Sequence, residues 1–82
     1  MDIPKVTSAK VIDDQTLLIA FDNRQKKKYD LTRLLDQEMF APLKNPALLK
    51  AIQVEQGGYA VVWDENIDIS EYELWSHGQT IP

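Results

Sequence analysis

Apolar and polar residues alternate along much of the chain with the period of two that is typical of β-strands. In the most regular segment, Leu17, Ile19 and Phe21 share one face. Leu18 and Ala20 share the other, so both faces are expected to be at least partly covered. The pattern predicts strands over residues 6–13, 16–22, 25–30, 52–55, 59–63 and 67–69.

Capping residues mark the helices that interrupt and follow these strands. Asn45 suits an N-cap and Pro46 suits the first helical position. Ser70 and Glu73 match a capping box, and Gly78 is expected to cap the end of the same helix. The helices predicted in this way cover residues 31–35, 46–51 and 71–77.

Two turns between strands are predicted from their residue types. Gly57 and Gly58 both accept a positive φ, which favours a tight hairpin. Asn23 and Arg24 stand where another two-residue loop belongs. Arginine tolerates a positive φ poorly, so a longer loop stays open as an alternative there.

The order of these elements indicates an α+β fold. We expect a small, mostly antiparallel, meander-like sheet of five to six short strands with two or three short helices. One domain is expected over residues 1–82, with residues 79–82 as a frayed tail. A domain of this size buries only about 60–65% of the surface that its unfolded chain exposes. A homodimer would bury more, and stays open.

Composition excludes several classes of protein. The chain has 82 residues, of which 44% are hydrophobic and 27% are charged, as in ordinary globular domains. It contains no cysteine, which excludes disulfides, thiolate zinc sites and cysteine nucleophiles. The N-terminal residues lack the apolar stretch of a signal peptide, and no apolar run approaches the roughly 18 residues of a membrane span. We therefore expect a cytoplasmic protein.

Charge is distributed unevenly around a net value of −4. All nine basic residues lie at or before Lys50, together with seven acids, and the six charged residues after it are all acidic. The preferred interpretation is that the two halves pair within one fold. The alternative is that they leave two faces of opposite sign for partners.

Catalytic chemistry is not indicated by any motif. His77 is the only histidine, and its place in the last helical turn suits a cation at a helix C-terminus better than a metal ligand. Gly57 and Gly58 precede a predicted strand rather than a helix, so a phosphate-binding loop is not expected. We expect neither enzymatic activity nor a metal or cofactor.

Several stretches in a fixed order carry a family resemblance. They are Val6-Thr7-Ser8, Leu17 to Asn23, Tyr29-Asp30-Leu31 with Leu34-Leu35, Phe40-Ala41-Pro42-Leu43, Pro46-Ala47-Leu48, Gly57-Gly58, Val62-Trp63 and Asp68-Ile69. Together they resemble the bacterial "domain of unknown function 2442", over about residues 5–75.

This resemblance implies a compact α+β domain that often accompanies a small toxin-like protein encoded beside it. It offers no catalytic residues. The chain departs from the usual pattern at Arg24 and Asn66, where the family commonly has glycine, which bears on the two turns.

The leading functional hypothesis is a protein-interaction domain, antitoxin-like, that binds a small companion protein. Tyr59 and Trp63 are expected in the core, because each ring buries much surface. Tyr72 and Trp75 are three residues apart and share a helix face with acids such as Glu71 nearby. If that face is exposed, these three residues form the candidate partner-binding site, for a basic protein.

Two other classes of function stay open. The first is DNA binding by the first sheet, through Lys5, Lys10, Arg24, Lys26, Lys27 and Lys28. Of the three consecutive lysines, Lys27 should face away from Lys26 and Lys28, and lysines that protect an edge strand are the preferred interpretation. The second is small-molecule binding or an unrecognised enzyme.

Overall fold

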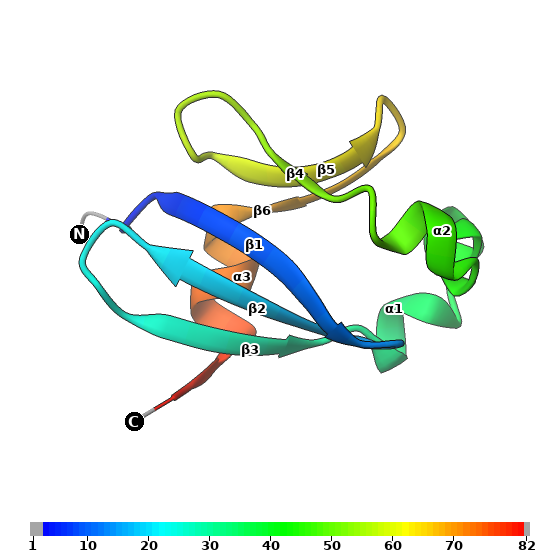
Figure 1. Cartoon of the computed structure of the whole chain (residues 1–82), viewed down its shortest axis with the longest axis horizontal. Coiled ribbons are helices and arrows are strands. Elements are labelled where there is room, and N and C mark those ends of the chain that lie inside the picture. The colour runs from blue at the N-terminus through cyan, green and yellow to red at the C-terminus, as the bar shows by residue number, and fades with distance from the viewer. Residues whose placement is uncertain (1–2, 82) are drawn as a thin grey trace.

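Two antiparallel sheets and several short helices form the protein, in a computed structural model that describes residues 3–81 (Figure 1). The elements in chain order are β1 (Val6–Asp13), β2 (Thr16–Phe21), β3 (Lys26–Asp30), α1 (Thr32–Leu35), the 3-10 helix η1 (Glu38–Lys44), α2 (Pro46–Leu49), β4 (Gln53–Val54), β5 (Ala60–Asp64), β6 (Ile67–Ser70), α3 (Glu71–His77) and β7 (Gln79–Thr80). The α+β class is confirmed, with seven strands in the described residues rather than five to six.

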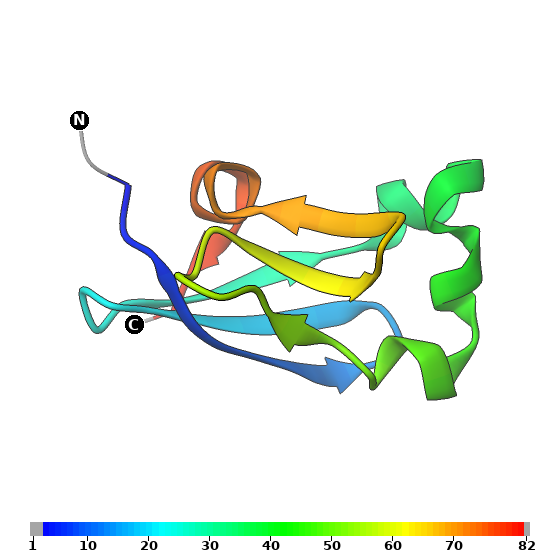
Figure 2. The same cartoon turned by 90° about the horizontal axis from the view of Figure 1, so that it is seen from above.

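The expected single meander is divided into two sheets. One has the strand order β1-β2-β3-β7 and the other β4-β5-β6. The division arises because the chain leaves β3 and passes through α1, η1 and α2 at one end of the molecule before it returns as β4 (Figure 2). The two sheets meet where the Val6 N–H donates to the Gly58 carbonyl over 2.9 Å.

The core lies between the two sheets and α3. The alternation predicted for β2 is confirmed: Leu17, Ile19 and Phe21 are buried, while Leu18 and Ala20 are only partly covered. The other large buried side chains are Val6, Tyr29, Leu31, Phe40, Leu43, Leu49, Val61, Trp63, Ile67, Ile69 and Leu74. Trp63 satisfies its indole N–H by donating to the Leu49 carbonyl over 3.0 Å, as a buried indole requires.

Helix caps follow the sequence closely. The Asn45 side chain accepts from the Ala47 N–H over 3.0 Å, and Pro46 opens α2. Lys50 is already the C-cap of this helix, so α2 has four residues and is shorter than predicted. Within residues 3–81, no helix is both long and apolar enough to cross a bilayer.

Backbone conformation at the turns is partly unexpected. Gly57 and Gly58 take the expected positive φ values of 89° and 77°, but the connection is longer than the predicted tight hairpin, because β4 ends at Val54 and β5 begins at Ala60. The two-residue loop predicted at Asn23 and Arg24 is not formed, since β2 ends at Phe21 and β3 begins at Lys26. Within this longer loop Arg24 has a positive φ of 72°, and its N–H donates to the Phe21 carbonyl. Gly78 caps α3 as predicted, yet its backbone is extended rather than left-handed, because the chain continues directly into β7.

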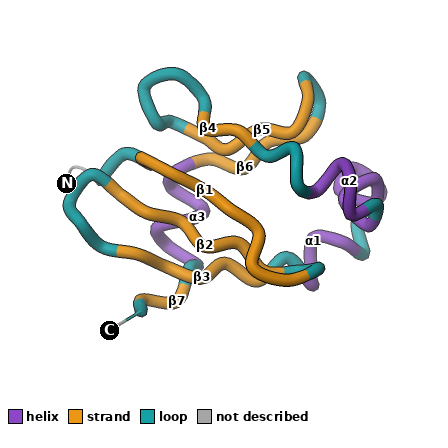
Figure 3. The backbone as a smooth tube through the Cα atoms, viewed as in Figure 1, coloured by secondary structure: helices purple, strands orange, loops and turns teal. Residues whose placement is uncertain are grey.

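The prediction of a frayed tail is wrong for residues 79–81, which pair with β3. Gln79 and Thr80 form β7, which pairs with Lys28 and Lys27 of β3 (Figure 3). Pro82, the last residue of the predicted tail, lies outside the described residues. Because β7 occupies the outer side of β3, the interpretation of the three lysines as protection for an edge strand is also wrong.

The hydrogen bonds of Asp30, in the turn after β3, should make the stability of the protein depend on pH. The Asp30 carboxylate accepts from the Thr32 hydroxyl and N–H over 2.5 and 2.8 Å, and these bonds lower its pKa below the ordinary value of 3.8. A carboxyl whose pKa is lowered by folding stabilises the protein above its unfolded pKa, and this contribution is lost as the pH falls through the folded value. Asp30→Asn keeps an acceptor but does not titrate. The free energy of unfolding of Asp30→Asn, measured by urea titration, should therefore fall less between pH 7 and pH 3 than that of the wild type. An equal fall in both proteins would contradict the lowered pKa of Asp30.

Candidate functional site

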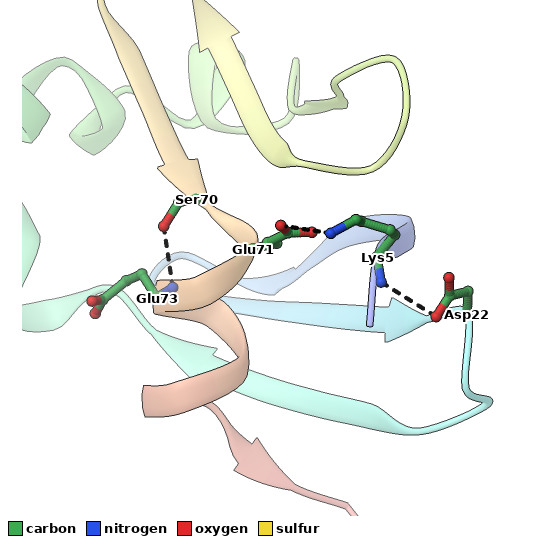
Figure 4. Close-up of polar contacts among 5 residues, drawn as sticks. All are labelled: Lys5, Asp22, Ser70, Glu71 and Glu73. Carbon is green, nitrogen blue, oxygen red and sulfur yellow. Dashed lines mark hydrogen bonds and ion pairs between the residues drawn. The ribbon is translucent and has the colours of Figure 1, made fainter. Parts of the chain in front are cut away.

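Helix α3 is positioned by its own first residues. The Glu73 N–H donates to the Ser70 hydroxyl over 3.1 Å, so the N-cap is confirmed (Figure 4). Ile69 and Leu74 are both buried on either side of this cap, as a hydrophobic staple requires. The first turn therefore carries Glu71 and Glu73 on a fixed backbone, beside the end of β6.

Glu71 is paired with a residue from the opposite end of the chain. Lys5 Nζ lies 2.9 Å from Glu71 Oε1, and this hydrogen bond raises the pKa of Lys5 (Figure 4). The same ammonium lies 4.6 Å from the centre of the Tyr59 ring, a cation–π distance. The backbone N–H of Lys5 donates to the Asp22 carboxylate over 3.3 Å. The pair joins the basic and acidic halves of the chain, in line with the preferred interpretation of the charge distribution.

The Glu73 carboxylate contacts Tyr29 of β3 and His77 of its own helix. The Tyr29 hydroxyl donates to Glu73 Oε2 over 2.7 Å, and burial, followed by this bond, raises the pKa of Tyr29. His77 Nδ1 lies 3.2 Å from the other carboxylate oxygen. Both acids of the first turn therefore hold α3 to the rest of the fold.

Trp75 and Lys27 contact each other at the far end of α3. The Trp75 ring meets the ring of Phe21 edge-on, with 5.2 Å between their centres. Lys27 Nζ lies 3.9 Å from the centre of the Trp75 ring and donates to the Trp75 carbonyl over 2.5 Å. Only 9% of Lys27 is exposed. Its inward direction, opposite to Lys26 and Lys28, is as predicted, and it fixes the last turn of the helix.

Two tyrosines are the exposed aromatic side chains near the start of α3. Tyr72 is 60% exposed and Tyr59 is 57% exposed. The Glu71 N–H donates to the Tyr59 carbonyl over 2.9 Å, which brings the two segments together. We call Lys5, Tyr59, Glu71 and Tyr72 the tyrosine surface.

The prediction that the Tyr59 ring packs in the core is wrong, because the side chain is exposed. The residue ends the glycine turn instead of beginning a strand, since β5 starts at Ala60. Trp63, by contrast, is buried as predicted.

The remaining basic candidates lie on the first sheet. Lys10, Lys26 and Lys28 are exposed on its strands, and Arg24 is exposed in the turn between β2 and β3. Among residues 3–81 the ion pairs are Lys5–Glu71 and Glu73–His77, so these four residues have no such partner in that range.

The described residues form hollows at the surface but no cluster of metal ligands. Within the described part of the chain, no three acidic or histidine side chains cluster as metal ligands. A hollow of about 270 Å³ lies beside α2, between Pro46, Leu49 and Lys50 on one side and Val11 and Ile12 on the other. This volume is below the usual range for small-molecule sites. A larger and more open hollow, of about 480 Å³, lies within that range and is lined by Ile3, Pro4, Lys5, Asp22 and Asn23.

Comparison with known proteins gives one family. A family model described as "Protein of unknown function (DUF2442)" matches residues 6–80, nearly the whole chain. No curated protein and no solved structure matches the chain.

Proposed function

This chain belongs to the DUF2442 family of proteins of unknown function, and on that premise we propose that it is a protein-interaction domain. It acts in the cytoplasm as the accessory, antitoxin-like companion of a small basic protein. The tyrosine surface is the contact site.

Exposed tyrosines on a fixed backbone carry this proposal. Tyrosine is enriched among the residues that dominate interface energies, since it offers a large contact area for few rotatable bonds. Tyr59 and Tyr72 are both more than half exposed, although a domain this small needs its aromatic residues for its core. The Lys5–Glu71 pair beside them holds the surface in one conformation and leaves few groups to be ordered on binding.

Trp75 has a supporting part in this proposal. Its ring is partly buried against Phe21 and Lys27, so it positions the helix that presents Tyr72. Glu71 orients Lys5 below the Tyr59 ring in the same way. Of the three partner-binding residues suggested by the sequence, Tyr72 is therefore the one that we propose for direct contact, with Glu71 and Trp75 supporting it.

Native mass spectrometry of the chain purified gently from its own host tests the proposal. We expect a stoichiometric complex with a small basic protein, which is then produced separately for titration. Tyr72→Ala and Tyr59→Ala should each weaken this complex about tenfold or more, as truncation of a central interface tyrosine does.

Met39→Ala is the matched control, because Met39 is also 60% exposed but lies in η1. It should leave the affinity unchanged. A chain that is recovered only as a monomer or homodimer would refute the companion role. A complex that is weakened by Met39→Ala and not by Tyr72→Ala would refute the assigned surface.

A further inference from the structure

One face of the four-stranded sheet is not covered by any described element. Helix α3 packs behind β1, β2 and β3, and the opposite face is turned toward the viewer in Figure 1. Leu18 and Ala20 point to this side, because their neighbours Leu17, Ile19 and Phe21 point into the core.

Strand register arranges the residues of this face in two rows across the sheet. Leu18 pairs with Lys10 on one side and with Lys28 on the other. Ala20 pairs with Ser8 and Lys26 in the same way. We call these six residues the basic face.

Positive charge surrounds an apolar centre on the basic face. With strands about 4.8 Å apart, the backbones of Lys10 and Lys28 are about 10 Å apart on opposite sides of Leu18. Lys26 follows at about 7 Å along β3 from Lys28. The nearest acids on this side of the sheet, Asp13 and Asp30, flank Thr16 in the next row, and Asp30 lies about 7 Å from Lys28 along β3. Their carboxylates accept hydrogen bonds within their own turns, from the Gln15 N–H and from Thr32.

A hollow of about 200 Å³ opens between these rows. Its lining residues are Ser8, Ala9, Lys10, Leu18, Ala20 and Lys26. It has room for an apolar side chain over Leu18 and Ala20, with Lys10 and Lys26 at its edge and Lys28 outside it. An apolar centre with a charged rim is the usual anatomy of a protein interface.

We infer that the basic face is a second docking surface, for an acidic protein segment that carries an apolar side chain at its centre. The partner's carboxylates would meet Lys10, Lys26 and Lys28, and its apolar side chain would fill the hollow. Charge complementarity gives this occupant: the face has three cations without an ion-pair partner among residues 3–81. The inference concerns a surface separate from Tyr59 and Tyr72 and stands independently of the proposed function.

Features of the same face disfavour nucleic acid. Single strands bind to sheets by stacking bases on aromatic side chains, and the basic face has none. Three lysines neutralise few phosphates, so this face offers little of the counterion release that drives nucleic-acid binding. The apolar hollow has no counterpart in a phosphate backbone.

Titration of the ¹⁵N-labelled protein with three fluorescein-labelled probes tests the inference. They are a 12-residue Glu- and Asp-rich peptide with a central leucine, the same peptide with alanine at the centre, and a single-stranded DNA 12-mer. We expect the leucine peptide to bind with a dissociation constant below about 1 mM, with amide shifts confined to β1, β2 and β3. The alanine peptide should bind several-fold more weakly.

Charge reversal on the face identifies the contact residues. Lys28→Glu should lower the affinity for the leucine peptide about tenfold or more. Lys50→Glu, at an exposed lysine beside α2, should change this affinity less than threefold. Tyr72→Ala should have no effect, which separates this surface from the tyrosine surface. The inference is overturned by DNA that binds the same amides more tightly than the peptide, by equal effects of the two lysine variants, or by the absence of binding at millimolar peptide.

Discussion

Gly58→Ala is expected to destabilise the domain by about 3 kcal/mol or more, because two separate costs meet at this residue. Its φ of +77° is a conformation that an alanine adopts only under strain. A Cβ at this position would also collide with the backbone carbonyl oxygen of Val6 and lie 2.9 Å from the Val6 nitrogen. That nitrogen donates the hydrogen bond that joins β1 to the second sheet, so the collision cannot be relieved without opening the junction.

Gly57→Ala provides the matched control for this effect. Gly57 has a similar φ of +89°, but the added Cβ would meet only the ring of Tyr59, 2.7 Å away. That ring is exposed and can turn aside, which leaves the conformational cost of about 1–2 kcal/mol. Urea unfolding of both variants measures the difference. Equal losses would show that the approach to Val6 is not important for stability.

Leu74→Ala is the second change with a large expected effect, of about 2–5 kcal/mol. Leu74 is completely buried and is the one buried residue of α3. At about 0.05–0.15 kcal/mol per residue, a domain of 82 residues has roughly 4–12 kcal/mol of stability in total. The substitution therefore removes a large share of it, and leaves α3 held mainly by the contacts of Glu71, Glu73 and Trp75.

Tyr72→Ala, on the same helix, is the control for this prediction. Tyr72 is mostly exposed, so its loss should change the free energy of unfolding by about 0.5 kcal/mol or less. Thermal and urea unfolding, followed by Trp63 and Trp75 fluorescence, measure both variants. If Leu74→Ala cost less than about 1 kcal/mol, the packing of α3 would have to be different from that described.

These stability measurements also support the functional tests. A Tyr72→Ala protein that keeps its stability but loses its partner identifies the tyrosine as a contact residue. A Leu74→Ala protein has lost the core packing of the helix that presents the tyrosine, so a loss of binding by this variant would carry no such information. The exposed lysines of the basic face are likewise open to substitution, because they lie outside the core.

Local features of this protein were determined by the sequence. The caps at Asn45 and Ser70, the glycine turn and the alternation along β2 all appear where the residue types place them. Each depends on hydrogen bonds or sterics within a few residues, so neighbours in the sequence suffice to specify it. The opposite directions of Lys27 and Lys28 follow from the strand period for the same reason.

Contacts between distant segments were decided only by the tertiary structure. Nothing local indicates that Lys5 pairs with Glu71, that Lys27 meets Trp75, or that residues 79–80 add a strand to β3. The division into two sheets depends on where the chain goes after β3, and the exposure of Tyr59 depends on where β5 begins. Such choices are made by the packing of the whole chain, since each contact becomes favourable only after the others have brought its partners together.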